Sequence, residues 1–144
     1  MAYRWKSKYS HGLSYTSFVL TDLKVTGPTE SKEVVFIDVN VTVRNTGSFM
    51  GSEVVQVYVS LPPNGTTTPL RQLRGFVKAR DIPPGKTKSS SIKLDKYAFS
   101  FWDTPNGEWR VLSGKYGLHI GTSSDNIVLE ASVDLKSSFG WNGI

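Results

Sequence analysis

The 144-residue sequence contains no cysteine and only two histidines. The absence of cysteine excludes disulfides, zinc–thiolate sites and thiol nucleophiles, so stability has to come from a packed core. His11 and His119 lie far apart in the chain, and neither has a second histidine at a metal-ligand spacing. We therefore expect no metal site and no cofactor.

The sequence also has no run of 18 apolar residues, so we expect no membrane-spanning helix and no membrane partner. Residues 1–10 are basic but lack the apolar stretch of a secretory signal, so no leader peptide is visible. With 144 residues, of which 38% are hydrophobic, the chain has the size and composition of one globular domain.

Positive charge is concentrated in residues 71–96, although the net charge of the whole chain is only +5. Such a stretch is either a surface that binds a polyanion or a solvent-exposed face of a sheet with its loops. We favour the second interpretation. No RNA-binding aromatic motif accompanies it, so nucleic acid is not an expected partner. The basic residues are Arg71, Arg74, Lys78, Arg80, Lys86, Lys88, Lys93 and Lys96, against Asp81 and Asp95.

Apolar residues recur with a period of two, which predicts strands with one buried face. The longest example places Val35, Ile37, Val39, Val41 and Val43 on one face. About seven strands separated by turn signals predict an all-β fold, an antiparallel sandwich of the fibronectin type III or immunoglobulin class. The expected strands are 16–27, 33–47, 52–62, 86–94, 115–123 and 126–135, with extended pieces in 70–82 and 107–114 and one helical turn capped by Asp95.

No arrangement typical of catalysis is visible in the sequence. A GxSxG elbow and a P-loop are both missing, and no carboxylate pair is flanked by residues that would build a sugar cleft. Among the clustered aromatics, Phe101 and Trp109 are predicted to be core, whereas Trp102 is expected to be partly exposed. Asn40 and Asn64 match the N-glycosylation pattern.

Five segments, in this order, resemble the C-terminal fibronectin type III-like domain of glycoside hydrolase family 3 β-glucosidases, especially the secreted fungal kind. They are HGLSYTSF, VTVRNTGSFMGSEVVQVYVSLP, PLRQLRGFVKARDIPPGKT, FSFWD and SGKYGLHIGTSSDNI. The resemblance implies that the nucleophilic aspartate and the acid/base glutamate lie in domains that this sequence does not contain. It therefore implies a non-catalytic accessory module of a secreted enzyme that hydrolyses terminal β-D-glucosyl residues.

The resemblance also suggests a division of the chain. Residues 1–10 are expected to be a remnant of an interdomain linker and 11–136 the fibronectin type III-like domain. Residues 137–144 are expected to be a C-terminal tail, whose Phe139 and Trp141 either dock on the sandwich or mark a foreign or disordered end. The family usually has Phe-Gly before GLSYT and polar or small residues where this chain has Phe49 and Met50.

The stretch YSHGLSYTSF is interpreted as the seam with a preceding domain. Its seam residues are His11, Gly12, Leu13, Tyr15 and Phe18, and we expect Tyr15 and Phe18 to be substantially buried.

Two functions follow from these observations. The first is a structural domain that packs on the catalytic domains of a parent glycosidase and stabilises them. The second is a binding module for an insoluble plant-wall polymer, namely cellulose, lignin or an anionic polysaccharide. Its candidate binding residues are Arg71, Arg74, Lys78, Tyr97, Trp102 and Phe49.

Overall fold

The computed structural model describes residues 16–31, 34–62 and 71–141. The predictions for His11, Gly12, Leu13, Tyr15 and Asn64 lie outside the described residues. Among the residues described, no helix has both the length and the apolar character needed to cross a bilayer.

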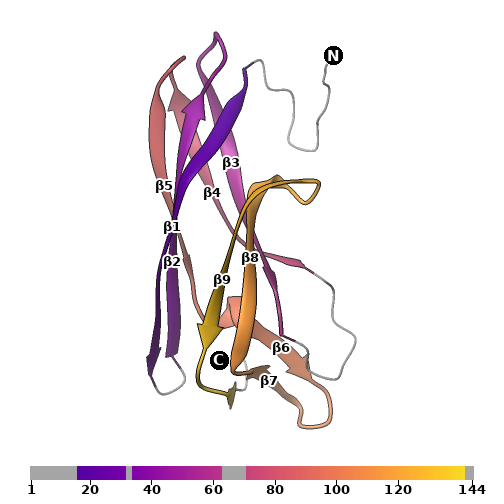
Figure 1. The fold of residues 1–144 in the computed structure, drawn as a ribbon. Coiled ribbons are helices and arrows are strands. Elements are labelled where there is room, and N and C mark those ends of the chain that lie inside the picture. The colour runs from indigo at the N-terminus through magenta and orange to yellow at the C-terminus, as the bar shows by residue number, and fades with distance from the viewer. Residues whose placement is uncertain (1–15, 32–33, 63–70, 142–144) are drawn as a thin grey trace.

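Two antiparallel sheets face each other and form the body of the molecule (Figure 1). This arrangement confirms the predicted β-sandwich. The first sheet has the order β1-β2-β5, and the second has the order β4-β3-β8-β9. Their strands are β1 (Phe18–Ser31), β2 (Val34–Asn45), β5 (Thr87–Leu94), β4 (Gln72–Ile82), β3 (Gly51–Ser60), β8 (Gly114–Ser123) and β9 (Asn126–Leu135).

A third, smaller sheet closes one end of the sandwich together with the single turn η1 (Lys96–Phe99) (Figure 1). Asp95 caps this turn, because its carboxylate accepts a hydrogen bond of 3.0 Å from the N–H of Tyr97. The small sheet was not predicted, and it raises the number of strands in the described part of the chain above seven. Its strands, in order, are β10 (Phe139–Trp141), β7 (Glu108–Val111) and β6 (Ser100–Asp103).

The C-terminal segment docks on the sandwich, which is the first of the two alternatives stated for it. The carboxylate of Glu30 on β1 accepts hydrogen bonds of 3.0 Å from the N–H groups of Lys136 and Ser137. Beyond them, β10 pairs with β7, and Trp141 is only 6% exposed. The folded unit therefore extends past residue 136.

Alternating burial along the strands confirms the predicted core faces. Along β2, every second residue from Val35 to Val43 is apolar and at most 1% exposed. Burying side chains of this size stabilises a fold by about 1.5–3 kcal/mol each. The core aromatics are Phe99 and Tyr116, whose rings meet edge to face at 5.2 Å.

The prediction that Phe101 and Trp109 are core residues was wrong, because both side chains are only half-buried. Phe101 pairs with Arg110 and lies on the side of the small sheet away from the buried Ser100 and Val111. Trp109 lies on the same side of β7 as the buried Val111, but its own side chain stays half-buried. A pattern of period two gives the faces of a strand, but it does not show where the core ends.

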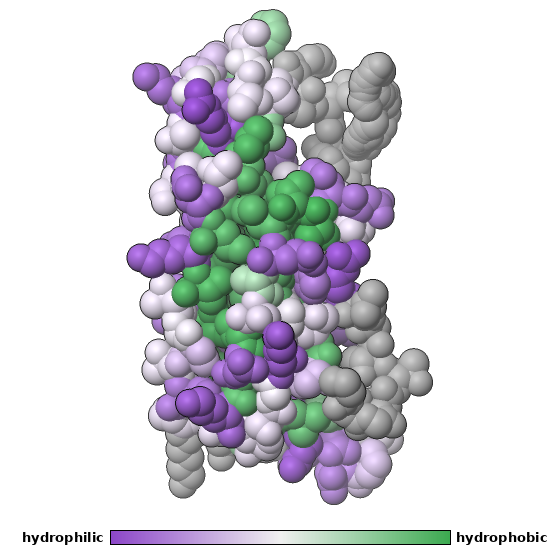
Figure 2. All heavy atoms as spheres, viewed as in Figure 1, coloured by the Kyte–Doolittle hydropathy of each residue, from purple (hydrophilic) through white to green (hydrophobic). Residues whose placement is uncertain are grey.

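The side of the molecule seen in Figure 2 has a band of hydrophobic surface between charged side chains. This side carries β1 and β9, which are edge strands of the two sheets and contact each other (Figure 1). Val19 on β1 and Val128 on β9 are about half exposed.

Candidate interdomain seam and contact surfaces

Asn45, at the end of β2, connects three segments at one end of the sandwich. Its side chain is fully buried and makes four hydrogen bonds. The amide oxygen accepts from Thr16 Oγ1 at 2.7 Å and from the N–H of Gly47 at 2.9 Å. The amide nitrogen donates to the carbonyls of Phe49 at 2.7 Å and Ile82 at 2.8 Å. Every hydrogen-bonding position of this buried amide is therefore used.

The segment that leads into β1 is held beside the β2–β3 loop by the same contacts. The N–H of Thr46 donates to the carbonyl of Ser17 at 2.8 Å. Glycine is required at position 47 of the loop, because a Cβ there would lie 1.9 Å from Thr16 Oγ1 and 2.8 Å from the backbone nitrogen of Ser17. Phe18 packs against the core but is only half-buried, which is less than predicted.

The β2–β3 loop presents an apolar pair to solvent at this end. Phe49 is 62% exposed and Met50 is 60% exposed. The loop lies at the same end as the start of β1 and the β4–β5 loop (Figure 1). Because Asn45 binds the Phe49 carbonyl, the pair is held in place rather than carried on a free loop. We call residues 16–18 together with Phe49 and Met50 the seam end.

The six residues predicted to bind a polymer do not form one site. Phe49 lies at the seam end, whereas Tyr97 on η1 and Trp102 on β6 lie at the opposite end (Figure 1). Of the three basic residues, Arg71 comes just before β4 and is exposed, whereas Arg74 and Lys78 lie on β4 and are half-buried and exposed, respectively. No single extended ligand surface contains all six, and polymer binding stays a prediction.

A ladder of three tryptophans crosses the small sheet. Trp109 on β7 lies directly opposite Trp102 on β6 and Trp141 on β10. The rings of Trp102 and Trp109 meet edge to face at 5.4 Å, and those of Trp109 and Trp141 stack at 6.0 Å. Trp141 is also fixed by a hydrogen bond of 2.9 Å from its indole N–H to Ser100 Oγ.

Exposure increases along this ladder from its buried end outward. Trp141 is 6% exposed, whereas Trp102 is 49% exposed. Tyr97, 54% exposed, contacts the ring of Trp141 edge to face at 4.7 Å, and Lys96 Nζ lies 4.5 Å above the same ring. The outer part of the ladder is a rigid aromatic surface, which suits stacking on a flat ligand or burial against another domain.

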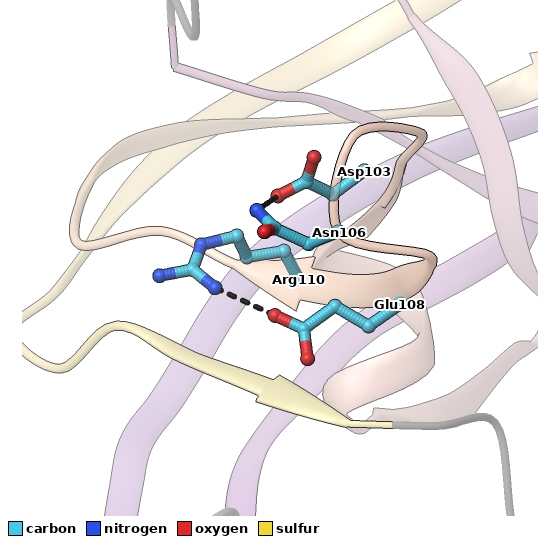
Figure 3. Close-up of polar contacts among 4 residues, drawn as sticks. All are labelled: Asp103, Asn106, Glu108 and Arg110. Carbon is cyan, nitrogen blue, oxygen red and sulfur yellow. Dashed lines mark hydrogen bonds and ion pairs between the residues drawn. The ribbon is translucent and has the colours of Figure 1, made fainter.

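The β6–β7 hairpin carries two carboxylates directly opposite each other, Asp103 and Glu108. Figure 3 shows that each has its own partner: Asn106 Nδ2 donates to Asp103 at 2.7 Å, and Arg110 Nη1 lies 2.8 Å from Glu108. A glycosidase pair requires one carboxyl group that stays protonated and one that is ionised. Two separately compensated carboxylates at a hairpin tip instead stabilise the turn.

Ser60, His119 and Glu130 form a hydrogen-bonded row across β3, β8 and β9 that the sequence did not reveal. Ser60 Oγ lies 3.1 Å from His119 Nε2, and His119 Nδ1 lies 2.5 Å from Glu130 Oε2. This order matches that of a serine hydrolase, but all three residues lie within paired strands of one sheet. We interpret the row as a cross-strand stabilising network.

Gly117 makes room for this row, since a Cβ there would lie 2.4 Å from Ser60 Oγ and 2.9 Å from His119 Nε2. The only signal in the sequence is the alternation of Gly117 and His119 on a strand. Within residues 16–31, 34–62 and 71–141, no group of three or more metal-ligating side chains comes together. Asn40 lies in the middle of β2, the central strand of its sheet, and is half-buried.

Comparison with known proteins identifies the family. The model of the fibronectin type III-like domain matches residues 53–124. The chain belongs to this family. It is 36% identical over 136 residues to probable beta-glucosidase H of Emericella nidulans and 39% identical over 140 residues to a beta-glucosidase of Kluyveromyces marxianus. Each match covers 94% of this chain but only 16% of the relative.

A solved structure shows the same relationship. Beta-glucosidase 3B from Thermotoga neapolitana, in complex with alpha-D-glucose, superposes on 92% of this chain with a TM-score of 0.81 and 30% identity. Only 18% of that enzyme is covered. The resemblance to the fibronectin type III-like domain of family 3 β-glucosidases is therefore confirmed, and the chain spans about a sixth of the length of the relatives it matches.

Proposed function

We propose that this domain is a non-catalytic accessory module of a β-glucosidase, which packs on the catalytic domains and stabilises them. The single observation that carries this proposal is that the chain matches only 16% of β-glucosidases that are far longer. The pair Asp103 and Glu108 does not suit glycoside hydrolysis, since each carboxylate is compensated within one hairpin.

The seam end supports a docking role in physical terms. Two large apolar side chains, Phe49 and Met50, are each about 60% exposed, and burying them against another domain would remove apolar surface from water. Their loop is fixed by Asn45 to Thr16, where the chain leads into β1. A surface that is already rigid loses little conformational entropy on docking.

Activity of the isolated chain tests the non-catalytic part of the proposal. The purified protein is expected to fold and to leave an aryl β-glucoside unhydrolysed at concentrations that would reveal a slow enzyme. Hydrolysis that a single substitution in this chain abolishes would contradict the proposal. Such a result would place glycosidase machinery within the 144 residues.

A second candidate function is binding to a plant-wall polymer, and the tryptophan ladder favours it. Trp102 and Tyr97 are about half exposed on a rigid base at the end opposite the seam. Sedimentation with insoluble cellulose and with lignin at low salt tests it, with Trp102→Ala as the variant and Val128→Ala as an exposed apolar control. Protein that stays in the supernatant excludes this function, and retention that Trp102→Ala abolishes supports it.

We also infer that the parent enzyme is secreted, as the resemblance implies. Expression in a fungal secretion host tests whether Asn40 carries a glycan. We expect none, because Asn40 is half-buried in the central strand and its backbone pairs on both sides. A mass shift that Asn40→Gln removes would contradict this expectation.

A further inference from the structure

The two sheets meet in an open groove at the side formed by β4 and β5. The groove has a volume of about 490 Å³ and is lined on one side by residues of β4 and on the other by residues of β5. Gly75 allows the close approach at its floor, since a Cβ there would lie 2.8 Å from Ile92 and 3.1 Å from Leu94. This volume is within the range of ordinary ligand sites.

Arg74, in the wall of the groove, has a donor that is not used. Its Nη2 donates to Gln72 Oε1, but its Nε is buried and has no hydrogen-bond partner. Among the described side chains it is the only buried nitrogen or oxygen in this state. Buried donors are nearly always paired in native proteins, so an unpaired one requires an explanation. Burial also lowers the pKa of Arg74, which a nearby anion would offset.

The ionisable side chains that line the groove are all basic. Of the ionisable side chains, the lining includes Arg74 and Lys93 and no acidic residue. Lys93 Nζ lies 4.3 Å above the ring of Phe36, whereas the buried Nε of Arg74 has no hydrogen-bond partner. A lining with two cations and no acid favours a negatively charged ligand.

The groove also has apolar walls and free strand edges. Phe76 is 69% exposed and Leu73 is 46% exposed, and both belong to the lining. In the part of the chain that the structure describes, β4 pairs only with β3, and β5 pairs only with β2. Their outer edges therefore present backbone groups to which an extended peptide can add.

We propose that this groove docks an extended peptide segment that carries a carboxylate next to an apolar side chain. The carboxylate binds Arg74, the apolar side chain packs on Phe76 and Leu73, and the backbone pairs with the edge of β4. A peptide accounts for all three features, whereas an acidic polysaccharide lacks the backbone groups for the strand edge. The segment belongs to another part of the parent β-glucosidase, an assignment that rests on the proposed function.

Nuclear magnetic resonance on the 144-residue protein tests the inference directly. The probe is a capped eight-residue peptide of alternating glutamate and valine, and the matched control replaces each glutamate by glutamine. We expect the acidic peptide to shift the Arg74 Nε–H signal and the amides of β4. We expect the glutamine peptide to bind at least about tenfold more weakly, as loss of a charged hydrogen bond predicts.

Two substitutions with equal change of charge locate the site. Arg74→Gln should weaken the acidic peptide about tenfold, whereas Arg44→Gln, at an exposed arginine on β2, should leave its affinity unchanged. Phe76→Ser should weaken binding severalfold at little cost in stability, because Phe76 is 69% exposed. Equal binding of the two peptides, shifts confined to other strands, or no shift at millimolar peptide would each overturn the inference.

Two further arms separate the alternatives. A trimer of galacturonate that binds more tightly than the peptide, with the same dependence on Arg74, would overturn the peptide assignment in favour of an acidic polysaccharide. If the peptide binds as described but the domain fails to stabilise a β-glucosidase, the groove inference holds and the proposed function falls. If the domain stabilises the enzyme but binds no acidic peptide, only the groove inference falls.

Discussion

Thr16 Oγ1 donates a hydrogen bond of 2.7 Å to the side-chain oxygen of Asn45, which is fully buried at the end of β2. Through this contact the segment that leads into β1 is joined to the loop that carries Phe49 and Met50. This hydrogen bond joins Thr16, near the start of the sequence, to the exposed apolar surface that begins at Phe49, 33 residues later. These residues belong to the seam end, which we assign to docking.

Asn45→Ala should lower the free energy of unfolding by about 2–4 kcal/mol, because it leaves the buried carbonyl of Ile82 and the carbonyl of Phe49 without their donor. Denaturant unfolding of the isolated domain measures this change. Asn40→Ala, at a half-buried asparagine on the same strand, is the control and should cost clearly less. Equal effects of the two substitutions would show that the Asn45 network does not hold the seam end.

Gly117→Ala should destabilise the domain through the row formed by Ser60 and His119, because the new Cβ would occupy the space of Ser60 Oγ. In a Ser60→Ala background the clash is smaller, so the same substitution should cost about 1 kcal/mol less. A double-mutant cycle by denaturant unfolding measures the difference. Additive effects would mean that Gly117 is not retained to make room for this contact.

Trp141→Ala should cost about 3–5 kcal/mol, since it removes a buried ring that stacks on Trp109 and bonds to Ser100. Trp102→Ala, at the exposed end of the ladder, should cost no more than about 1 kcal/mol. Thermal unfolding of the two variants compares them. A smaller loss for Trp141→Ala than for Trp102→Ala would be incompatible with β10 as part of the folded domain.

The stability of the domain should fall at high pH because of Tyr116. Burial, chiefly, raises the pKa of Tyr116 to about 12, although the N–H of Leu112, which donates to the hydroxyl oxygen at 3.2 Å, lowers it in part. Between pH 10 and 12 the unfolded chain loses this proton while the folded chain keeps it, so deprotonation favours unfolding.

The expected loss attributable to Tyr116 is about 2–3 kcal/mol by pH 12. Unfolding curves at pH 9, 10, 11 and 12 measure it as the difference between the wild type and Tyr116→Phe. Tyr97→Phe is the matched control, because Tyr97 is 54% exposed. A wild-type profile parallel to that of Tyr116→Phe would contradict the assignment.

Sequence periodicity predicted the two main sheets because a strand with one buried face repeats every two residues, as β2 does from Val35 to Val43. It predicted an extended piece at 107–114, where β7 lies, but it did not predict β6, β10 or the small sheet, because strands of three or four residues are too short to show a period. The partner of β10 is β7, about 30 residues away, and only the folded chain brings Trp141 opposite Trp109.

The candidate surfaces were harder to predict for a related reason. Charge density drew attention to residues 71–96, and the polymer-binding prediction added Phe49 and Trp102, which the fold places at opposite ends of the sandwich. The unpaired Nε of Arg74 and the row from Ser60 to Glu130 depend on which strands are neighbours. Strand order follows from the topology of the sandwich and not from local sequence pattern.

A chimeric enzyme tests the central claim most directly. In the chimera, this chain replaces the matching region of the Kluyveromyces marxianus beta-glucosidase. The thermal inactivation temperature of the chimera is compared with that of the same enzyme lacking the region. We expect the chimera to exceed the deletion by several degrees and to lose part of that gain with Phe49→Ser and Met50→Ser together, although these changes leave the isolated domain folded. A chimera no more stable than the deletion would contradict the account.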